Sequence, residues 1–146
     1  MKLIFYGKPK AIQSFRFTRQ GRKYQPKDVV NWKNWVASTA KKQLGNHKPF
    51  TGAVRIKRAL FVFPPVSSLK ADDKRYIASG GYILKTTKPD LTDNLFKGLI
   101  DALAGVVYDK DQQICHNCES YKVMGKEPRI EIEFEEINCL RIDKIE

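Results

Sequence analysis

The sequence contains no long apolar run. No stretch of its 146 residues approaches the ~18 to 20 apolar residues that a membrane-spanning helix needs, and the opening MKLIFYGKPK lacks the apolar core of a secretory leader. Internal repeats and low-complexity tracts are absent as well. We therefore expect one folded domain, residues 1–146, in the cytoplasm and without a membrane partner.

Cysteine and histidine are scarce, which limits two classes of site. The three cysteines, Cys115, Cys118 and Cys139, are an odd number in a chain without a secretory feature, so free thiols are expected. Cys115 and Cys118 have the spacing of half a zinc site, but no second pair completes four ligands. His47 and His116 are the two histidines, and neither has an evident orienting partner for cysteine-based catalysis.

Acidic residues are few beside basic ones. The chain has 16 Asp and Glu against 27 Lys and Arg, a net charge of +11. Clustered cations gain affinity for nucleic acid by releasing its condensed counterions, so this charge favours a polyanionic partner. In FRFTRQGRKY basic and aromatic residues alternate around Gly21, which suits phosphate contact with aromatic support. The alternative interpretation of this segment is a solvated loop or hairpin.

Hydrophobic periodicity predicts an α+β (α/β-like) fold. Residues 2–6 and 52–63 are expected as strands, and an amphipathic helix is expected between Pro26 and Gly45. A second helix is predicted over 92–104, and residues 106–108 and 113–123 are expected to be extended. The implied domain has a mixed sheet of about four to five strands with two main helices on one face, in the order β-α-β-α-β-β.

Two further segments constrain where DNA could lie. In the closing strand Ile130, Ile132 and Phe134 alternate with glutamates, which indicates one buried and one wet face. A row of glutamates repels phosphate, so the basic surface is expected elsewhere. The long polar connection over residues 66–87, with a helical turn in its middle, has the length of a functional or mobile segment.

Against this basic background, acid is concentrated in KPDLTDNLFKGLIDALAGVVYDKDQQI, Lys88 to Ile114. Asp93 and Lys97 are four residues apart and share one helix face, opposite the leucines. Helix capping and an ordinary ion pair would account for these two residues. They would not account for Asp90, ahead of the helix, or for Asp111 beyond it.

The distance along the helix sets a condition for a common site. A helix of about 12 residues is ~18 Å long, so Asp111 reaches the Asp90 end only if the following strand runs back alongside. Carboxylates gathered there would repel one another unless a divalent cation bound them, and such oxygen-rich clusters suit Mg²⁺ and substrate phosphate. The chemistry of that arrangement is phosphodiester hydrolysis, with a lysine neutralising charge in the transition state.

The same segment resembles the signature of the RusA family of Holliday-junction resolvases, of the phage or prophage type. That signature is an Asp-Leu-Asp-Asn-Leu-x-Lys run followed by Asp-Ala-Leu, a glycine and Asp-Asp-x-Gln. The positions that match are Asp93, Asn94, Leu95, Lys97, Asp111 and Gln113. The N-terminal segment and the closing strands resemble the family more loosely.

The resemblance implies a function, a site and an assembly. Asp90, Asp93 and Asp111 are expected to bind Mg²⁺, or Mn²⁺ in its place, and together with Lys97 to be the catalytic residues, with no small-molecule cofactor. A homodimer would place two sites about a two-fold axis for paired cuts in branched DNA. The candidates for the DNA-binding surface are Arg16, Arg19, Arg22, Lys23, Lys85 and Lys88.

Two departures from the signature leave alternatives open. Leu91 and Thr92 both stand between the leading aspartates, where the family has one residue, so Asp90 either bulges into place or is displaced. Lys110 occupies the position of an acid, and Asp109 is expected to be a turn residue. The leading hypothesis is a Mg²⁺-dependent endonuclease that resolves four-way junctions in DNA recombination and repair; the alternative is a catalytically inactive, basic nucleic-acid-binding module.

Overall fold

The computed structural model describes residues 1–12, 16–143 and 145. Its strands are β1 (Lys2–Tyr6), β2 (Arg16–Phe17), β3 (Lys23–Tyr24), β4 (Ala53–Phe63), β5 (Ile83–Leu84), β6 (Ile114–Met124) and β7 (Arg129–Ile137). The helices are α1 (Lys27–Leu44), α2 (Ala71–Ala78) and α3 (Lys97–Leu103), with a π-helical turn at Leu91–Phe96 and a 3₁₀ turn at Asp111–Gln113. The order of the main elements is the one that periodicity predicts.

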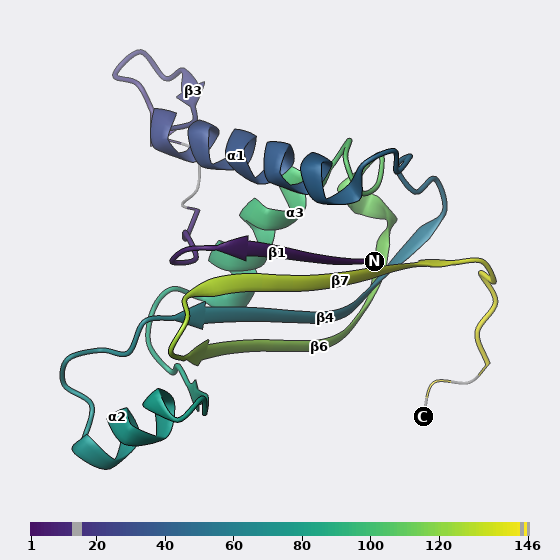
Figure 1. Ribbon diagram of the computed structural model, residues 1–146. Coiled ribbons are helices and arrows are strands. Elements are labelled where there is room, and N and C mark those ends of the chain that lie inside the picture. Colours follow the sequence, from purple (N-terminus) through teal and green to yellow (C-terminus); the bar gives the residue numbers. More distant parts are fainter. Residues whose placement is uncertain (13–15, 144, 146) are drawn as a thin grey trace.

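A five-stranded mixed sheet is the centre of the fold. Its strand order is β1-β7-β4-β6-β5, with β4 and β6 parallel and the other neighbours antiparallel. Helices α1 and α3 pack on one face, where they and the sheet enclose the main hydrophobic core (Figure 1). The expected α+β class, with two helices on one face of a mixed sheet, is confirmed. No helix in the described ranges is long and apolar enough to cross a membrane.

Helix α1 follows from its sequence pattern. Pro26 precedes its first turn, and Gly45 ends it with φ of 59°, a left-handed conformation that glycine adopts without strain. Val29, Val36 and Ala40 from its apolar stripe are buried. The stripe fixes the helix against the sheet, so the charged face of α1 remains in solvent.

The second predicted helix differs in its first turn. Residues Leu91–Phe96 form a π-helical turn, in which the Leu95 amide donates to the Asp90 carbonyl at 3.2 Å, and regular α-helix starts only at Lys97. A π-turn contains about one residue more than an α-turn. The additional residue between Asp90 and Asp93 is accommodated in this wider turn.

Two other segments depart from the expectation in detail. Val106, Val107 and Tyr108 are buried in a turn instead of forming a strand, because the chain must reverse there between α3 and β6. The long connection contains α2 and β5. In Figure 1, α2 projects from the end of the sheet where β4 and β6 finish.

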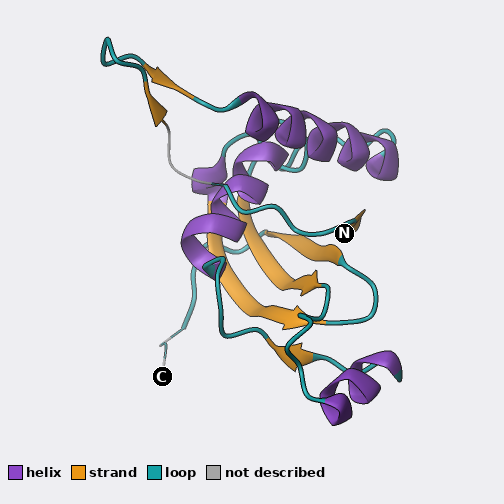
Figure 2. Cartoon of the chain, turned by 90° about the vertical axis from the view of Figure 1, so that its left-hand side faces the viewer, coloured by secondary structure: helices purple, strands orange, loops and turns teal. Residues whose placement is uncertain are grey.

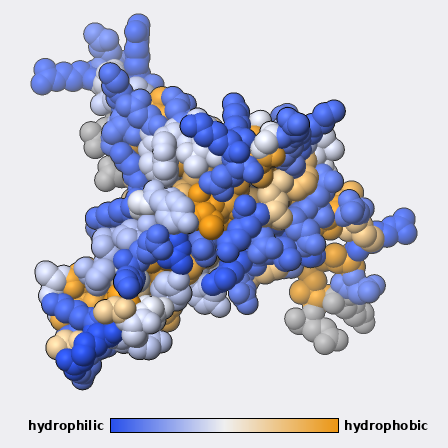
Figure 3. All heavy atoms as spheres, viewed as in Figure 1, coloured by the Kyte–Doolittle hydropathy of each residue, from blue (hydrophilic) through white to orange (hydrophobic). Residues whose placement is uncertain are grey.

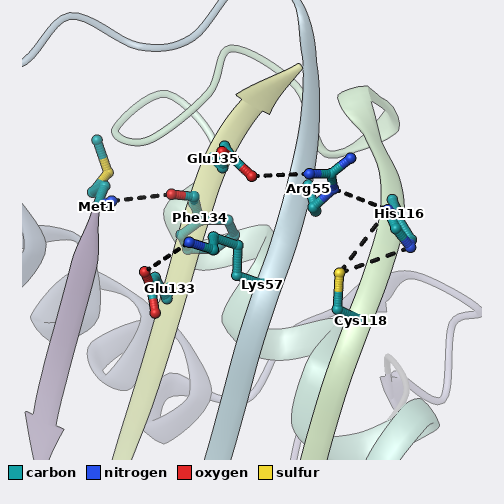
Figure 4. A network of polar contacts seen from close by, with 8 residues as sticks. All are labelled: Met1, Arg55, Lys57, His116, Cys118, Glu133, Phe134 and Glu135. Atoms are coloured by element: carbon teal, nitrogen blue, oxygen red, sulfur yellow. Dashed lines mark hydrogen bonds and ion pairs between the residues drawn. The ribbon is translucent and has the colours of Figure 1, made fainter. Parts of the chain in front are cut away.

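The glutamates of β7 lie on the solvent face of the sheet and are paired. Glu133 is 3.5 Å from Lys57, and Glu135 is 3.0 Å from Arg55 on the neighbouring strand (Figure 4). Opposite charges across a strand pair stabilise it modestly. These cations are therefore occupied in the sheet and do not form a phosphate-binding surface.

Candidate active site

Asn94 organises the segment that carries the leading aspartates. Its side-chain oxygen accepts from the Asp90 amide at 3.2 Å, and its side-chain nitrogen donates to the Ile12 carbonyl at 3.3 Å. The Ile12 amide donates in return to the Asn94 carbonyl at 3.2 Å. Ile12 lies directly over Gly98, where a β-carbon would overlap its side chain. Asn94 thus joins the N-terminal segment to the turn that presents Asp90 and Asp93.

A second anchor comes from the end of β6. The Lys122 ammonium donates to the carbonyls of Thr87 and Pro89, each at 2.7 Å. These two bonds fix the segment before Asp90 against the carboxyl end of β6. Asp90 and Asp93 are both exposed there, so their carboxylates are accessible to a ligand.

Lysine side chains line the hollows around Pro89 and Asp90. A hollow of about 450 Å³ is lined by Lys88, Pro89, Asp90 and Asn94, and another of about 410 Å³ next to it is lined by Lys8, Lys10 and Phe63. Lys85 and Lys88 line a third hollow, which shares Lys8, Phe63 and Pro89 with the second. Ammonium groups gathered around a hollow of this kind suit the phosphates of a nucleic-acid backbone.

The neighbouring positive charges change the pKa of Lys85. Burial, then the charges of Lys122 and Lys8, lower the pKa of its ammonium group. Its ammonium also lies 5.4 Å from the centre of the Phe63 ring. An anion placed among these lysines would relieve their mutual repulsion, which makes this hollow favourable for phosphate.

The basic segment around Gly21 forms a hairpin of β2 and β3, the form that the alternative interpretation gave it, and its contact with phosphate stays a prediction. Thr18 and Gly21 close its turn through a backbone hydrogen bond of 2.9 Å, and Arg19, Arg22 and Lys23 are exposed. Arg16 lies in β2, but its side chain is outside the described part of the structure. The hairpin projects beyond α1 (Figures 1 and 2), and hydrophilic side chains cover it in Figure 3. It adds exposed cations to the same end of the molecule.

Asp111 lies at the other end of the strands. It begins the 3₁₀ turn that leads into β6, and Gln113 of that turn donates to the carbonyls of Phe50 and Gly52, just before β4, at 2.8 and 2.9 Å. Asp90, in contrast, follows Pro89 beside Phe63 at the end of β4. The 11 residues of β4 separate these ends by roughly 30 Å, at about 3.3 Å per residue.

Tyr108 gives a second indication of where Asp111 lies. Its buried hydroxyl donates to the Ile100 carbonyl at 2.6 Å. Burial, then the charges of Asp111 and Asp101, raise the pKa of this hydroxyl. The charge of Asp111 therefore acts on the Tyr108 hydroxyl, which bonds to Ile100 in α3, whereas Asp93 lies in the turn before that helix.

Asp111 does not return to the Asp90 end of the helix within one chain. The strand that follows the helix begins only after Asp111, so it does not carry Asp111 back to Asp90. Among residues 1–12, 16–143 and 145, no three His, Cys, Asp or Glu side chains are grouped so that they could hold a metal ion. That finding covers Cys115 and Cys118 too, and in the same ranges the cysteines are free and exposed. The roles of Asp90, Asp93 and Asp111 as ligands stay a prediction.

Among the described residues, Asp90 and Asp93 also lack the helix cap and the ion pair that would give them a purely structural role. The Asp90 side chain does not cap the turn that follows it, and Asp93 forms no ion pair with Lys97 or with any other described cation. Other aspartates have partners, since Asp28 is 2.8 Å from Lys10 and Asp101 is 3.6 Å from Lys33. Asp90 and Asp93 are thus available for a ligand.

Sequence reasoning missed three residues of this site and the role of a fourth. Lys8, Lys10 and Lys122 lie far from the signature in the chain, and only the fold brings them to Pro89 and Asp90. Asn94 was matched to the signature without a role, and the structure gives it one. The sequence did contain one signal for this role. Asn94 directly follows Asp93 near the start of the predicted helix, where a side-chain amide is not needed for packing.

Removal of one cation from this hollow should weaken DNA binding in a salt-dependent way. We expect Lys88→Ala to reduce the slope of log affinity against log salt by about one, since one phosphate contact is lost. The measurement is a salt titration of binding to a four-way junction. Lys42→Ala, in the last turn of α1, is the matched control and should leave the slope unchanged; an equal effect of both would show diffuse binding.

Comparison with known proteins agrees with the signature. The family model for endodeoxyribonuclease RusA matches residues 6–135, which includes the hairpin, both anchors of Asp90 and the turn of Asp111. The chain is also similar to the uncharacterized protein YqaN of Bacillus subtilis (strain 168), with 30% identity over 145 residues, 95% of this chain and 98% of that protein. The chain therefore belongs to the RusA family of endodeoxyribonucleases, hydrolases that act on branched DNA at Holliday junctions.

Proposed function

We propose that the protein is a Mg²⁺-dependent, structure-selective endonuclease that resolves four-way junctions by paired phosphodiester hydrolysis in DNA recombination and repair. Family membership supports the reaction class. The observation that carries the site is the exposure of the Asp90 and Asp93 carboxylates without a structural partner, next to hollows that Lys8, Lys85 and Lys88 line. Mn²⁺ is expected to substitute for Mg²⁺, because both accept carboxylate and phosphate oxygens.

The separation of the aspartates suggests how the site is completed. Within one chain, Asp111 lies at the opposite end of the strands from Asp90. We therefore propose a homodimer in which each site takes Asp90 and Asp93 from one protomer and Asp111 from the other. Mg²⁺ binds through a few carboxylates together with substrate phosphate, so this set is sufficient. The ion, when bound, would polarise the phosphoryl oxygen and lower the pKa of a bound water.

The chain's own residues position the DNA. Lys8, Lys85 and Lys88 would bind the phosphates on either side of the scissile bond, because they line the hollows next to Asp90. Lys97, exposed at the start of α3, would neutralise charge that develops on the phosphoryl oxygens. Selectivity for branched DNA would come from shape and phosphate placement across the basic end of the molecule.

Cleavage of a synthetic four-way junction tests the proposal. We expect paired nicks with Mg²⁺ or Mn²⁺ and none with a chelator, and we expect Asp93→Asn to bind the junction without cutting it. Unchanged cutting by Asp93→Asn would reject the site. Tight binding by the unaltered protein, without cutting under either metal, would support the inactive binding module instead.

A further inference from the structure

The hollow that Lys85 and Lys88 line also has an apolar wall. Its volume is about 190 Å³, and residues 63–66, four consecutive apolar residues at the end of β4 and just after it, line it together with Pro89. The hollow lies at the end of the sheet from which α2 projects (Figure 1). Phosphate contacts account for the lysines but not for this apolar wall, so the hollow suits a ligand with an apolar part as well as charge.

The apolar wall is held in place by the fold. The Gly125 amide donates to the Phe63 carbonyl at 2.9 Å, and the Lys122 ammonium donates to the Pro89 carbonyl at 2.7 Å. The two prolines at 64 and 65 have a fixed φ and no backbone N–H. The hollow is therefore formed before a ligand arrives, and binding requires little further ordering of the chain.

Three ammonium groups complete the lining. The Lys85 ammonium is oriented by a hydrogen bond of 2.7 Å to the Thr87 hydroxyl and lies 5.4 Å from the centre of the Phe63 ring. Within the described ranges, Lys8 and Lys88 form no ion pair. A nucleotide of a DNA strand combines an apolar base face with a phosphate on each side. Its chemistry matches both parts of this lining.

The size of the hollow limits which part of DNA could enter. Its volume equals that of about six water molecules at ~30 Å³ each, so a single base fits and a base pair does not. A base can enter only after it has left the stack. This step is hardest in an uninterrupted duplex and easiest where pairing or stacking is already broken, as at the branch point of a four-way junction.

The hollow is continuous with the candidate site. Lys88 and Pro89 line both this hollow and the one that contains Asp90 and Asn94. Because consecutive nucleotides of a strand are adjacent, a base held here would belong to a nucleotide next to the phosphate held at Asp90. Occupation of the hollow would thus bring the scissile phosphate to the aspartates.

We propose that the hollow lined by residues 63–66 and Pro89 binds one unstacked base beside the scissile phosphate and thereby selects branched DNA over duplex. The proposal rests on the proposed function for the reaction and goes beyond it by naming a base-binding site. Phosphate contacts alone do not distinguish a junction from a duplex, whereas a site for an unstacked base does. Val66, exposed in this lining, is the specificity-determining residue.

The fluorescence of 2-aminopurine, which is quenched within a base stack, tests the site without cleavage. Four-way junctions with this base at single positions around the branch point are titrated with the unaltered protein in the presence of a chelator. We expect a several-fold rise at one position and none in a matching duplex. Val66→Trp, whose indole fills the hollow, should bind the junction without the rise. Val30→Trp, at an exposed valine of α1, is the matched control and should behave like the unaltered protein.

Cleavage with Mg²⁺ gives the second measurement. We expect Val66→Trp to cut the junction about tenfold or more slowly, because the stacking contact with the base is lost. An abasic nucleotide at the position that the fluorescence identifies should restore its rate, since no base then has to enter. Circular dichroism confirms that the variant is folded.

The two measurements separate this proposal from the proposed function. A bound junction without a fluorescence change at any position would overturn the base site, as would an equal rise in the duplex. Equal cleavage by Val66→Trp and the unaltered protein, or a slower rate that the abasic nucleotide does not restore, would also overturn it. If Val66→Trp abolishes the rise but the unaltered protein cuts no junction with Mg²⁺ or Mn²⁺, the base site stands and the proposed function fails.

Discussion

A mixture of two inactive proteins, Asp93→Asn and Asp111→Asn, should recover cleavage of a four-way junction. If each site combines Asp93 of one protomer with Asp111 of the other, a mixed dimer has one site with both substitutions and one intact site. After subunit exchange, about half of the dimers are mixed, so roughly a quarter of the sites are intact. Each parent should have lost about 10²-fold or more of its activity.

The product identifies the mixed dimer. One intact site can cut only one of two symmetry-related strands, so we expect a nicked junction and few paired cuts. The matched control is a mixture of Asp90→Asn and Asp93→Asn, whose substitutions affect the same half of the site and leave no intact pair. Differently tagged subunits, purified through both tags, prove that exchange has occurred. A doubly tagged Asp93→Asn and Asp111→Asn dimer without nicking would place the whole site in one chain.

The sequence predicted those elements whose residues repeat at a regular interval. The stripe of α1 and the alternation of β7 each specify a single buried face, and the structure confirms both. The edges of the sheet could not be predicted in this way. Whether β6 has a neighbour depends on where β5 lies, and β5 is only two residues long.

The candidate site was predictable in its residues and not in its geometry. The signature identified Asp90, Asp93 and Asp111 because it records which residues occur, in order along the chain. The distance between them depends on the direction of α3 and β6, which the signature does not contain. The structure shows that a helix and a turn carry the chain away from Asp90 before Asp111 is reached. A site shared between protomers therefore cannot be distinguished by sequence from a site within one chain.

The π-helical turn illustrates the same limit on a smaller scale. Apolar spacing predicted one helix over residues 92–104, because Leu95, Leu99 and Leu103 follow the helical period. All three are buried as expected. The hydrogen bond from Leu95 to the Asp90 carbonyl widens the first turn without moving these leucines to another face. The insertion before Asp93 thus changes how the polar residues are presented while the apolar face is kept.

Lys97→Ala should abolish turnover and leave junction binding nearly intact. The lysine stands one turn after Asp93, exposed and without an ion pair in the described structure, so its removal costs little stability. Its ammonium would act on charge that appears only in the transition state, and loss of one such group typically costs about 10² to 10³ in rate. Single-turnover cleavage and a binding titration, both with Mg²⁺, measure the two effects separately.

The control for this prediction is Lys33→Ala. The half-buried Lys33 of α1 pairs with Asp101 of α3. An ion pair near the surface contributes about 1 kcal/mol or less to stability, so cleavage should be unaffected. A parallel loss of binding and rate in Lys97→Ala would make the lysine a phosphate contact like Lys88. Unchanged single-turnover cleavage would exclude it from the reaction, and the charge developing on the phosphate would then have to be neutralised by the lysines around Pro89 alone.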